Sequence, residues 1–190
     1  MKRVELPSCQ HFNFSVPVDG SWASSRIEPD EVQAQKDQCR RVVESALCIE
    51  SILNIILMKG VFRELRGSRD FVDKHLMNSN HFSFASKKYL LKEFLRNTNL
   101  LSGSQKSALD EQLAKVIKYR NAFAHGTLIE KEIQMFISYF HSDHKEECLD
   151  DAFWEQLEKA FRGASDALDE LLNKIPPITV HFTDFPLGQK

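Results

Sequence analysis

An arginine, an asparagine and a histidine stand close together in the segment Tyr119–Gly126: Arg120, Asn121 and His125. Histidine has an ordinary pKa near neutrality, so it can accept and donate protons at physiological pH. Arginine keeps its charge and can bind an anionic group through two parallel hydrogen bonds. An arginine and a histidine at a helix end also commonly interact with the helix dipole and the last carbonyls. The residue types therefore leave a structural interpretation open beside the chemical one.

The helix that must position these residues is predicted from about Gln105 to Ala124 and closed by Gly126. At 100° per residue its apolar side chains form one stripe, and Arg120 falls near the middle of that stripe. An unpaired guanidinium buried there would be costly. We therefore expect Arg120 to be paired inside the fold, or to face a cleft or an interface. The stripe comprises Leu109, Leu113, Val116, Ile117, Phe123 and Ala124.

The three polar residues do not all share one side of this helix. Asn121 and His125 are four residues apart and so lie on one face. Arg120 and His125 are about 140° apart on an ideal helix. Their convergence needs either a distorted last turn or a second chain.

The rest of the chain predicts a mainly α fold with a bundle of four or five helices. Apolar residues at intervals of three and four predict a long helix over about 28–59, with Gly60 as its C-terminal cap. Shorter helices are predicted over 71–76 and 84–96. A last helix begins after Asp150 or Asp151 and runs to Ile175, where Pro176 stops it.

A β-hairpin is predicted between the last two helices. Residues 133–140 are rich in strand-forming side chains, and we expect a return through 147–149 after a turn over 142–145. The chain then divides into an irregular N-terminal arm (1–27), the helical domain (28–175) and an extended tail (176–190). Alternating segments at 12–18 and 178–182 suggest, weakly, that arm and tail pair.

The string Tyr119-Arg120-Asn121-Ala122-Phe123-Ala124-His125-Gly126 resembles the R-x4-6-H signature of the HEPN superfamily, the higher eukaryote and prokaryote nucleotide-binding domains. The polar Asn121 after the arginine also fits, as does a motif near the end of a late helix in a bundle of four or five helices. The resemblance covers about residues 30–175.

This resemblance implies a metal-independent endoribonuclease that acts as a homodimer, with both copies of the motif lining one cleft. His125 would move the proton during attack by the neighbouring 2′-hydroxyl. Arg120 would stabilise the charged phosphorane oxygens, and Asn121 would hold the imidazole or a phosphate oxygen. The competing interpretations are a non-catalytic HEPN-like domain that binds a partner protein or a nucleotide, and a helical interaction protein in which the motif is coincidental.

Residues around the motif extend the hypothesis. Residues 86–125 hold eight basic and three acidic side chains, a net charge of +5, whereas residues 130–170 carry a net charge of −8. A basic groove that binds RNA through Lys88, Lys115 and Lys118 follows as an expectation, with ordinary solvated helix faces as the alternative. Glu50 interrupts an apolar row on the first helix, so it is either a boundary residue or a partner of Arg120. Tyr119 is expected to pack in the core beside the motif, although stacking on an RNA base is chemically possible.

Composition narrows the class of protein. The chain has 190 residues, 42% of them hydrophobic and 27% charged, which is typical of one globular domain. The four cysteines form no CxxC pair, so we expect neither a disulfide framework nor a thiolate zinc site. No cofactor or metal is predicted. Neither a membrane span nor a secretory signal is evident, and the expected location is the cytoplasm. RNA, a second copy of the chain and a protein antitoxin or other regulator are the expected partners, in a toxin, defence or processing role.

Overall fold

The computed structural model describes residues 29–63, 68–79, 82–131 and 134–176. These residues form a mainly helical fold with a small antiparallel sheet, which confirms the predicted mainly α class. In chain order the elements are α1 (Pro29–Gly60), α2 (Arg69–Val72), the π-helical segment η1 (Asp73–Met77), α3 (Phe84–Arg96), α4 (Gly103–His125), β1 (Thr127–Lys131), β2 (Gln134–His141), β3 (Asp143–Cys148) and α5 (Asp151–Lys174).

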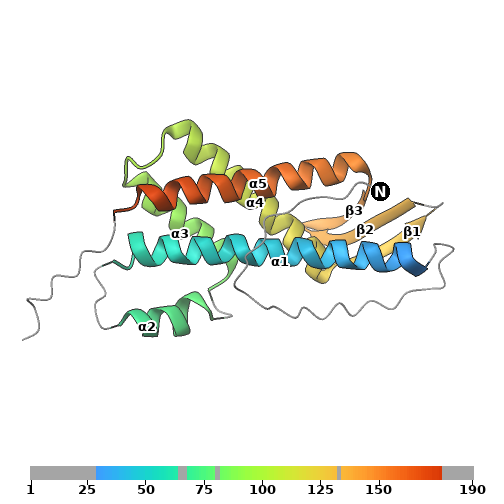
Figure 1. Ribbon diagram of the computed structural model, residues 1–190, viewed down its shortest axis with the longest axis horizontal. Coiled ribbons are helices and arrows are strands. Elements are labelled where there is room, and N and C mark those ends of the chain that lie inside the picture. The colour runs from blue at the N-terminus through green and yellow to red at the C-terminus, as the bar shows by residue number, and fades with distance from the viewer. Residues whose placement is uncertain (1–28, 64–67, 80–81, 132–133, 177–190) are drawn as a thin grey trace, which may run out of the picture.

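The three long helices α1, α4 and α5 lie alongside one another and enclose the core (Figure 1). α5 has the clearest amphipathic pattern, and its Trp154 and Phe161 are almost completely buried. They meet the apolar side of α1, where Ile49 and Leu53 are inaccessible to solvent. α3 packs against α1 and α4 at the end of the bundle away from the sheet (Figure 1). Burial of these stripes accounts for the arrangement of the bundle.

Side-chain caps explain where three helices begin. Ser83 caps α3, and Asp150 caps α5 by accepting a hydrogen bond of 2.8 Å from the backbone N–H of Phe153. Ser102 and Gln105 form a reciprocal capping box at the start of α4. This box makes α4 begin at Gly103, two residues before the predicted start. The predicted bounds of α3 agree with the structure.

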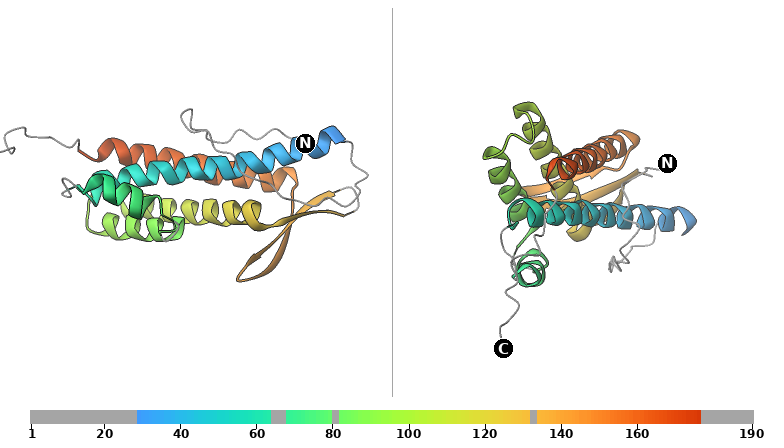
Figure 2. Two further views of the ribbon diagram at one scale, coloured as in Figure 1. Left: turned by 90° about the horizontal axis from the view of Figure 1, so that it is seen from below. Right: turned by 60° about the vertical axis from the view of Figure 1, so that its left-hand side comes forward.

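The sheet has three strands instead of the predicted two. β2 pairs with β1 on one side and with β3 on the other, in the order β1-β2-β3. The turn between β2 and β3 is tighter than predicted, because Ser142 adopts a left-handed conformation with φ of 64° and β3 begins directly after it. Figure 2 shows the sheet at one end of the helices, with a hairpin that projects away from them.

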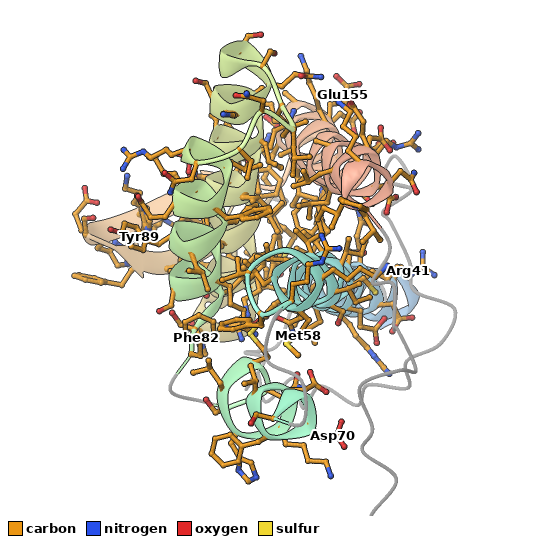
Figure 3. The ribbon with its side chains drawn as sticks, turned by 90° about the vertical axis from the view of Figure 1, so that its left-hand side faces the viewer. Arg41, Met58, Asp70, Phe82, Tyr89 and Glu155 are labelled. Atoms are coloured by element: carbon orange, nitrogen blue, oxygen red, sulfur yellow. The ribbon has the colours of Figure 1, made fainter. Side chains whose placement is uncertain are left out.

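The short segment α2–η1 covers the other end of α1. Figure 3 shows Met58 between α1 and this segment, and Met58 and Met77 are both buried there. Tyr89 lies on the outer side of α3 in the same view and is 64% exposed. The predicted helix over 71–76 is therefore present, with a π-helical second half that sequence periodicity does not indicate.

Several predictions fall outside this description. The predicted arm, 1–27, and all of the predicted tail after Pro176 lie outside the described residues, as does the suggested pairing of 12–18 with 178–182. Within the described ranges, no helix is both long enough and apolar enough to cross a membrane.

Candidate active site at the end of helix α4

The end of α4 is held against the sheet by a close backbone approach. The N–H of Gly126 donates a hydrogen bond of 2.7 Å to the carbonyl oxygen of Ala122. A Cβ at position 126 would lie 2.3 Å from that oxygen and 2.8 Å from the carbonyl oxygen of Ser138 on β2. Only glycine fits there, so Gly126 lets the chain leave α4 and enter β1 at once. Position 126 thus ends the helix as predicted, through a close approach to β2.

The buried side of α4 turns as the helix approaches this end. Leu109, Leu113 and Val116 are buried, as predicted. Farther along, Tyr119 and Ala122 are buried, whereas Ala124 is exposed, contrary to the predicted stripe. The reason is α5, which supplies a cluster of aromatic rings on that side of α4. Arg120 is consequently displaced from the centre of the buried face to its edge.

Tyr119 belongs to this aromatic cluster. Its ring meets the ring of Phe153 edge to face at 5.4 Å between centroids, and Phe123 stacks on Trp154 at 5.7 Å. Tyr119 is 6% exposed, and burial raises the pKa of its hydroxyl. The expected packing role fits these contacts, and the ring offers no open face to an RNA base.

Arg120 is partly buried and lacks a carboxylate partner among the described residues. Its Nη1 donates a hydrogen bond of 3.0 Å to Oδ1 of the adjacent Asn121. Its Nε is buried with no hydrogen-bond partner in the described part of the chain. A buried donor on a charged group without an acceptor is costly. Arg120 is thus a cation whose charge no carboxylate in the described ranges compensates.

Of the two interpretations left open for Glu50, the pairing with Arg120 is not found among the described contacts. Glu50 instead accepts a hydrogen bond of 2.5 Å from Nζ of Lys87, which joins α1 to α3. Lys87 is 4% exposed, so its ammonium needs this partner. Sequence periodicity identified the unusual carboxylate, but the choice between two candidate cations depends on which helix packs beside it.

Asn121 and His125 are both exposed at the end of α4. They lie one helical turn apart on the same face, as predicted. α4 stays α-helical through His125, so the last turn does not wind down in the way that would bring Arg120 and His125 together. Within one chain the two side chains therefore leave the helix in different directions.

The three lysines predicted to bind RNA each have a carboxylate neighbour. Lys88 approaches Asp110 at 2.9 Å, and Lys115 approaches Glu111 at 2.7 Å. The Lys115–Glu111 pair is exposed and therefore weak, whereas the Lys88–Asp110 pair is partly buried. The basic stretch is thus partly neutralised by its own helices.

Lys118 has the most complete set of contacts of the three. It binds Oε1 of Glu147 at 2.7 Å, and the hydroxyl of Tyr139 donates to the same oxygen at 2.6 Å. Its ammonium also lies 5.3 Å from the centre of the Tyr119 ring and 5.9 Å from that of Tyr139. Partial burial opposes ionisation of Glu147, but the bonds from Lys118 and Tyr139 outweigh it and lower the pKa of the carboxyl. This network attaches α4 to the sheet, a role that sequence reasoning missed.

Neither a search for metal ligands nor comparison with known proteins adds to this description of the site. Among the described residues, no group of three or more histidine, cysteine, aspartate or glutamate side chains is arranged to hold a metal ion. Comparisons of the chain with models of known families, with curated proteins and with solved structures give no match.

Proposed function

We propose that the protein is a metal-independent endoribonuclease of the HEPN type, which acts as a homodimer at the ends of its two α4 helices. One observation carries the proposal: Arg120 is a partly buried cation with no carboxylate partner among the described residues, and it stands beside exposed Asn121 and His125. A fold tolerates such a group more readily when a ligand supplies the missing anion. A phosphodiester supplies it.

In the proposed reaction the 2′-hydroxyl of RNA attacks the adjacent phosphorus, and the bond to the 5′-oxygen of the next nucleotide breaks. His125 accepts or donates the transferred proton, because imidazole titrates near neutral pH. The guanidinium of Arg120 binds the phosphorane oxygens as their charge develops. Asn121, already bonded to Arg120, holds the guanidinium in place. The products are a 2′,3′-cyclic phosphate and a 5′-hydroxyl.

The dimer is part of the mechanism. Because α4 is regular through His125, the histidine and Arg120 of one chain point about 140° apart. A second copy, related by a two-fold axis near the end of α4, would place one chain's Arg120 opposite the other chain's His125. Each cleft would then combine residues from both chains.

An RNA-cleavage assay in EDTA tests the proposal. The wild type is expected to cleave a mixed RNA and leave 2′,3′-cyclic phosphate ends. His125→Ala is expected to lose activity about 10²- to 10⁴-fold while melting like the wild type, because His125 is exposed. His141→Ala, which removes another exposed histidine, is the matched control and should stay active. Full activity in His125→Ala would overturn the mechanism.

A second candidate is a non-catalytic HEPN-like domain that binds a partner protein, such as an antitoxin, or a nucleotide. The observation that favours it is the pairing of Lys88, Lys115 and Lys118 with carboxylates, which weakens the expected RNA groove. If neither wild type nor variant cleaves RNA, but Arg120→Met abolishes binding of a partner from the same cell, this second function is favoured.

A further inference from the structure

A cavity of about 520 Å³ lies between α3 and the first half of α4. The buried side chains of Leu91, Leu95, Leu109 and Leu113 provide the apolar part of its lining. Sites for small molecules typically have volumes of about 300–1,000 Å³, with mostly apolar walls and a few polar groups that orient the ligand. The size and the leucine lining of this cavity match that description.

The polar part of the lining is basic. Four cations line the cavity, against the two carboxylates Asp110 and Glu111. The lining therefore carries a formal net charge of +2, although the whole chain carries −2. The cations are Lys88, Lys92, Arg96 and Lys106.

One carboxylate, that of Asp110, forms ion pairs with two of these cations. Lys88 approaches Oδ1 of Asp110 at 2.9 Å, and Lys92 approaches Oδ2 at 3.6 Å. Partial burial opposes ionisation of Asp110, but the two ammonium groups outweigh it and hold the pKa of the carboxyl below its usual value. With Asp110 fully ionised at neutral pH, one positive charge of this group is still uncompensated.

Lys106 carries a second positive charge that no carboxylate in the described part of the chain compensates. Its Nζ donates a hydrogen bond of 2.9 Å to the carbonyl oxygen of Thr98, which is a neutral acceptor. The other carboxylate of the lining, Glu111, is bonded to Lys115, which does not line the cavity. Arg96, by contrast, is satisfied by Glu93 at 2.7 Å. Two cations therefore remain for a ligand with two negative charges.

We propose that this cavity binds a small phosphate monoester with an apolar body. The leucine lining takes the apolar part, and Lys92 and Lys106 take the phosphate, which carries a charge of about −1.5 to −2 at pH 7. Lys106 lies fourteen residues before Arg120 on the same helix, about 21 Å along its axis. The inference is thus independent of the function proposed for the end of α4.

Calorimetric titration with octyl phosphate tests the inference. Octyl phosphate is expected to bind, and inorganic phosphate and octanol are expected to bind at least about 10-fold more weakly, because each lacks one half of the recognition. Binding is also expected to weaken as salt rises, since the pairs near the surface are screened. No binding of octyl phosphate would overturn the inference, and equal binding of inorganic phosphate would overturn the role of the leucine lining.

Two variants at Gly103 distinguish the effect of cavity charge on ligand binding from an effect on folding. A Cβ at this position meets no atom within 4 Å, and Gly103 is the first residue of α4 and lines the cavity. A glutamate there favours the helix through its dipole but repels an anion. Gly103→Glu is therefore expected to melt no lower than Gly103→Gln, yet to bind octyl phosphate about 10-fold more weakly.

The lysine variants complete the test. Lys92→Gln and Lys106→Gln are each expected to lower the affinity about 10-fold or more, the usual effect of losing one hydrogen bond to a charged group. Lys145→Gln removes a lysine of β3 that is 40% exposed and lies outside the cavity, and it is expected to bind like the wild type. If all of these variants bind octyl phosphate equally, the ligand lies elsewhere and the assignment of this cavity is wrong.

Discussion

Lys87 and Arg120 are cations on the neighbouring helices α3 and α4, and they differ in whether a carboxylate neutralises them. Lys87 is 4% exposed and sits between α1 and α3, where Glu50 neutralises it at 2.5 Å. Arg120 is partly buried at the end of α4, and among the described residues its side chain bonds only to the neutral amide of Asn121, at 3.0 Å. The first cation has what a buried charge needs to be stable, and the second does not.

This difference separates a structural ion pair from a candidate site. A buried cation with a carboxylate contributes to the specificity of helix packing, and its removal affects folding. A cation with a buried, unpartnered Nε adds no comparable stability. Its presence is easier to explain by an anionic ligand. The comparison therefore predicts opposite consequences when each site is altered.

The largest expected effect is on activity at Arg120. Arg120→Met keeps an unbranched side chain but removes the charge, so RNA cleavage should fall about 10²- to 10³-fold. The free energy of unfolding should change by less than about 1 kcal/mol, because the variant strands no buried carboxylate. Cleavage assays in EDTA and urea denaturation measure the two quantities. Loss of stability as large as that of a Glu50 variant would make Arg120 a structural residue and break the comparison.

The next effect is on stability at Glu50. Glu50→Ala leaves the ammonium of Lys87 buried without a partner and should lower the free energy of unfolding by about 3 kcal/mol. Adding Lys87→Met should restore most of this loss, because it removes the stranded charge. Glu44→Ala is the matched control on the same helix: its partner Arg40 is 50% exposed, so less than about 1 kcal/mol is expected. Equal losses at Glu44 and Glu50 would contradict the structural role of the buried pair.

The smallest expected effect is on the pH dependence of stability at Glu147. This carboxylate neutralises Lys118, just as Glu50 neutralises Lys87. The pKa of Glu147 is lower in the folded protein than its ordinary value, so its ionised form stabilises the fold. This contribution is complete at neutral pH and is lost as the pH falls below about 4.3, the ordinary glutamate value, through the lowered folded-state value. Glu147→Gln should cost about 1 kcal/mol at pH 7.

Denaturation curves from pH 7 to pH 3 measure this dependence. The difference in stability between wild type and Glu147→Gln should shrink as the pH falls. A difference that stays constant over that range would show that the carboxylate's charge does not support the contact between α4 and the sheet.

The sequence predicted structure best where a local interaction, such as a helix cap, determines it. The bounds of α3 and the start of α5 after Asp150 follow from local periodicity and side-chain caps. The β1 strand was missed because its five residues carry little signal of their own and depend on pairing with β2. Thr127 and Ile129, both β-branched and directly after Gly126, were the available signal.

The functional residues, too, were predicted only in part from the sequence. The spacing of Arg120, Asn121 and His125 placed them near one helix end and identified Arg120 as anomalous. Sequence reasoning also counted Lys92, Arg96 and Lys106 among the basic residues, but it did not group them. Their meeting around one cavity depends on how α3 packs against α4.

By itself, then, the amino-acid sequence determined the mainly α class, the face on which Asn121 and His125 lie, and the presence of a misplaced charge on α4. These properties depend on residues a few positions apart, whose relation is set by helix geometry. The tertiary structure decided that Glu50 pairs with Lys87, that Lys118 reaches Glu147, and that no carboxylate of the described residues reaches Arg120. A cation takes whichever carboxylate packing brings within reach, and the residues that packing brings together here are up to 37 positions apart.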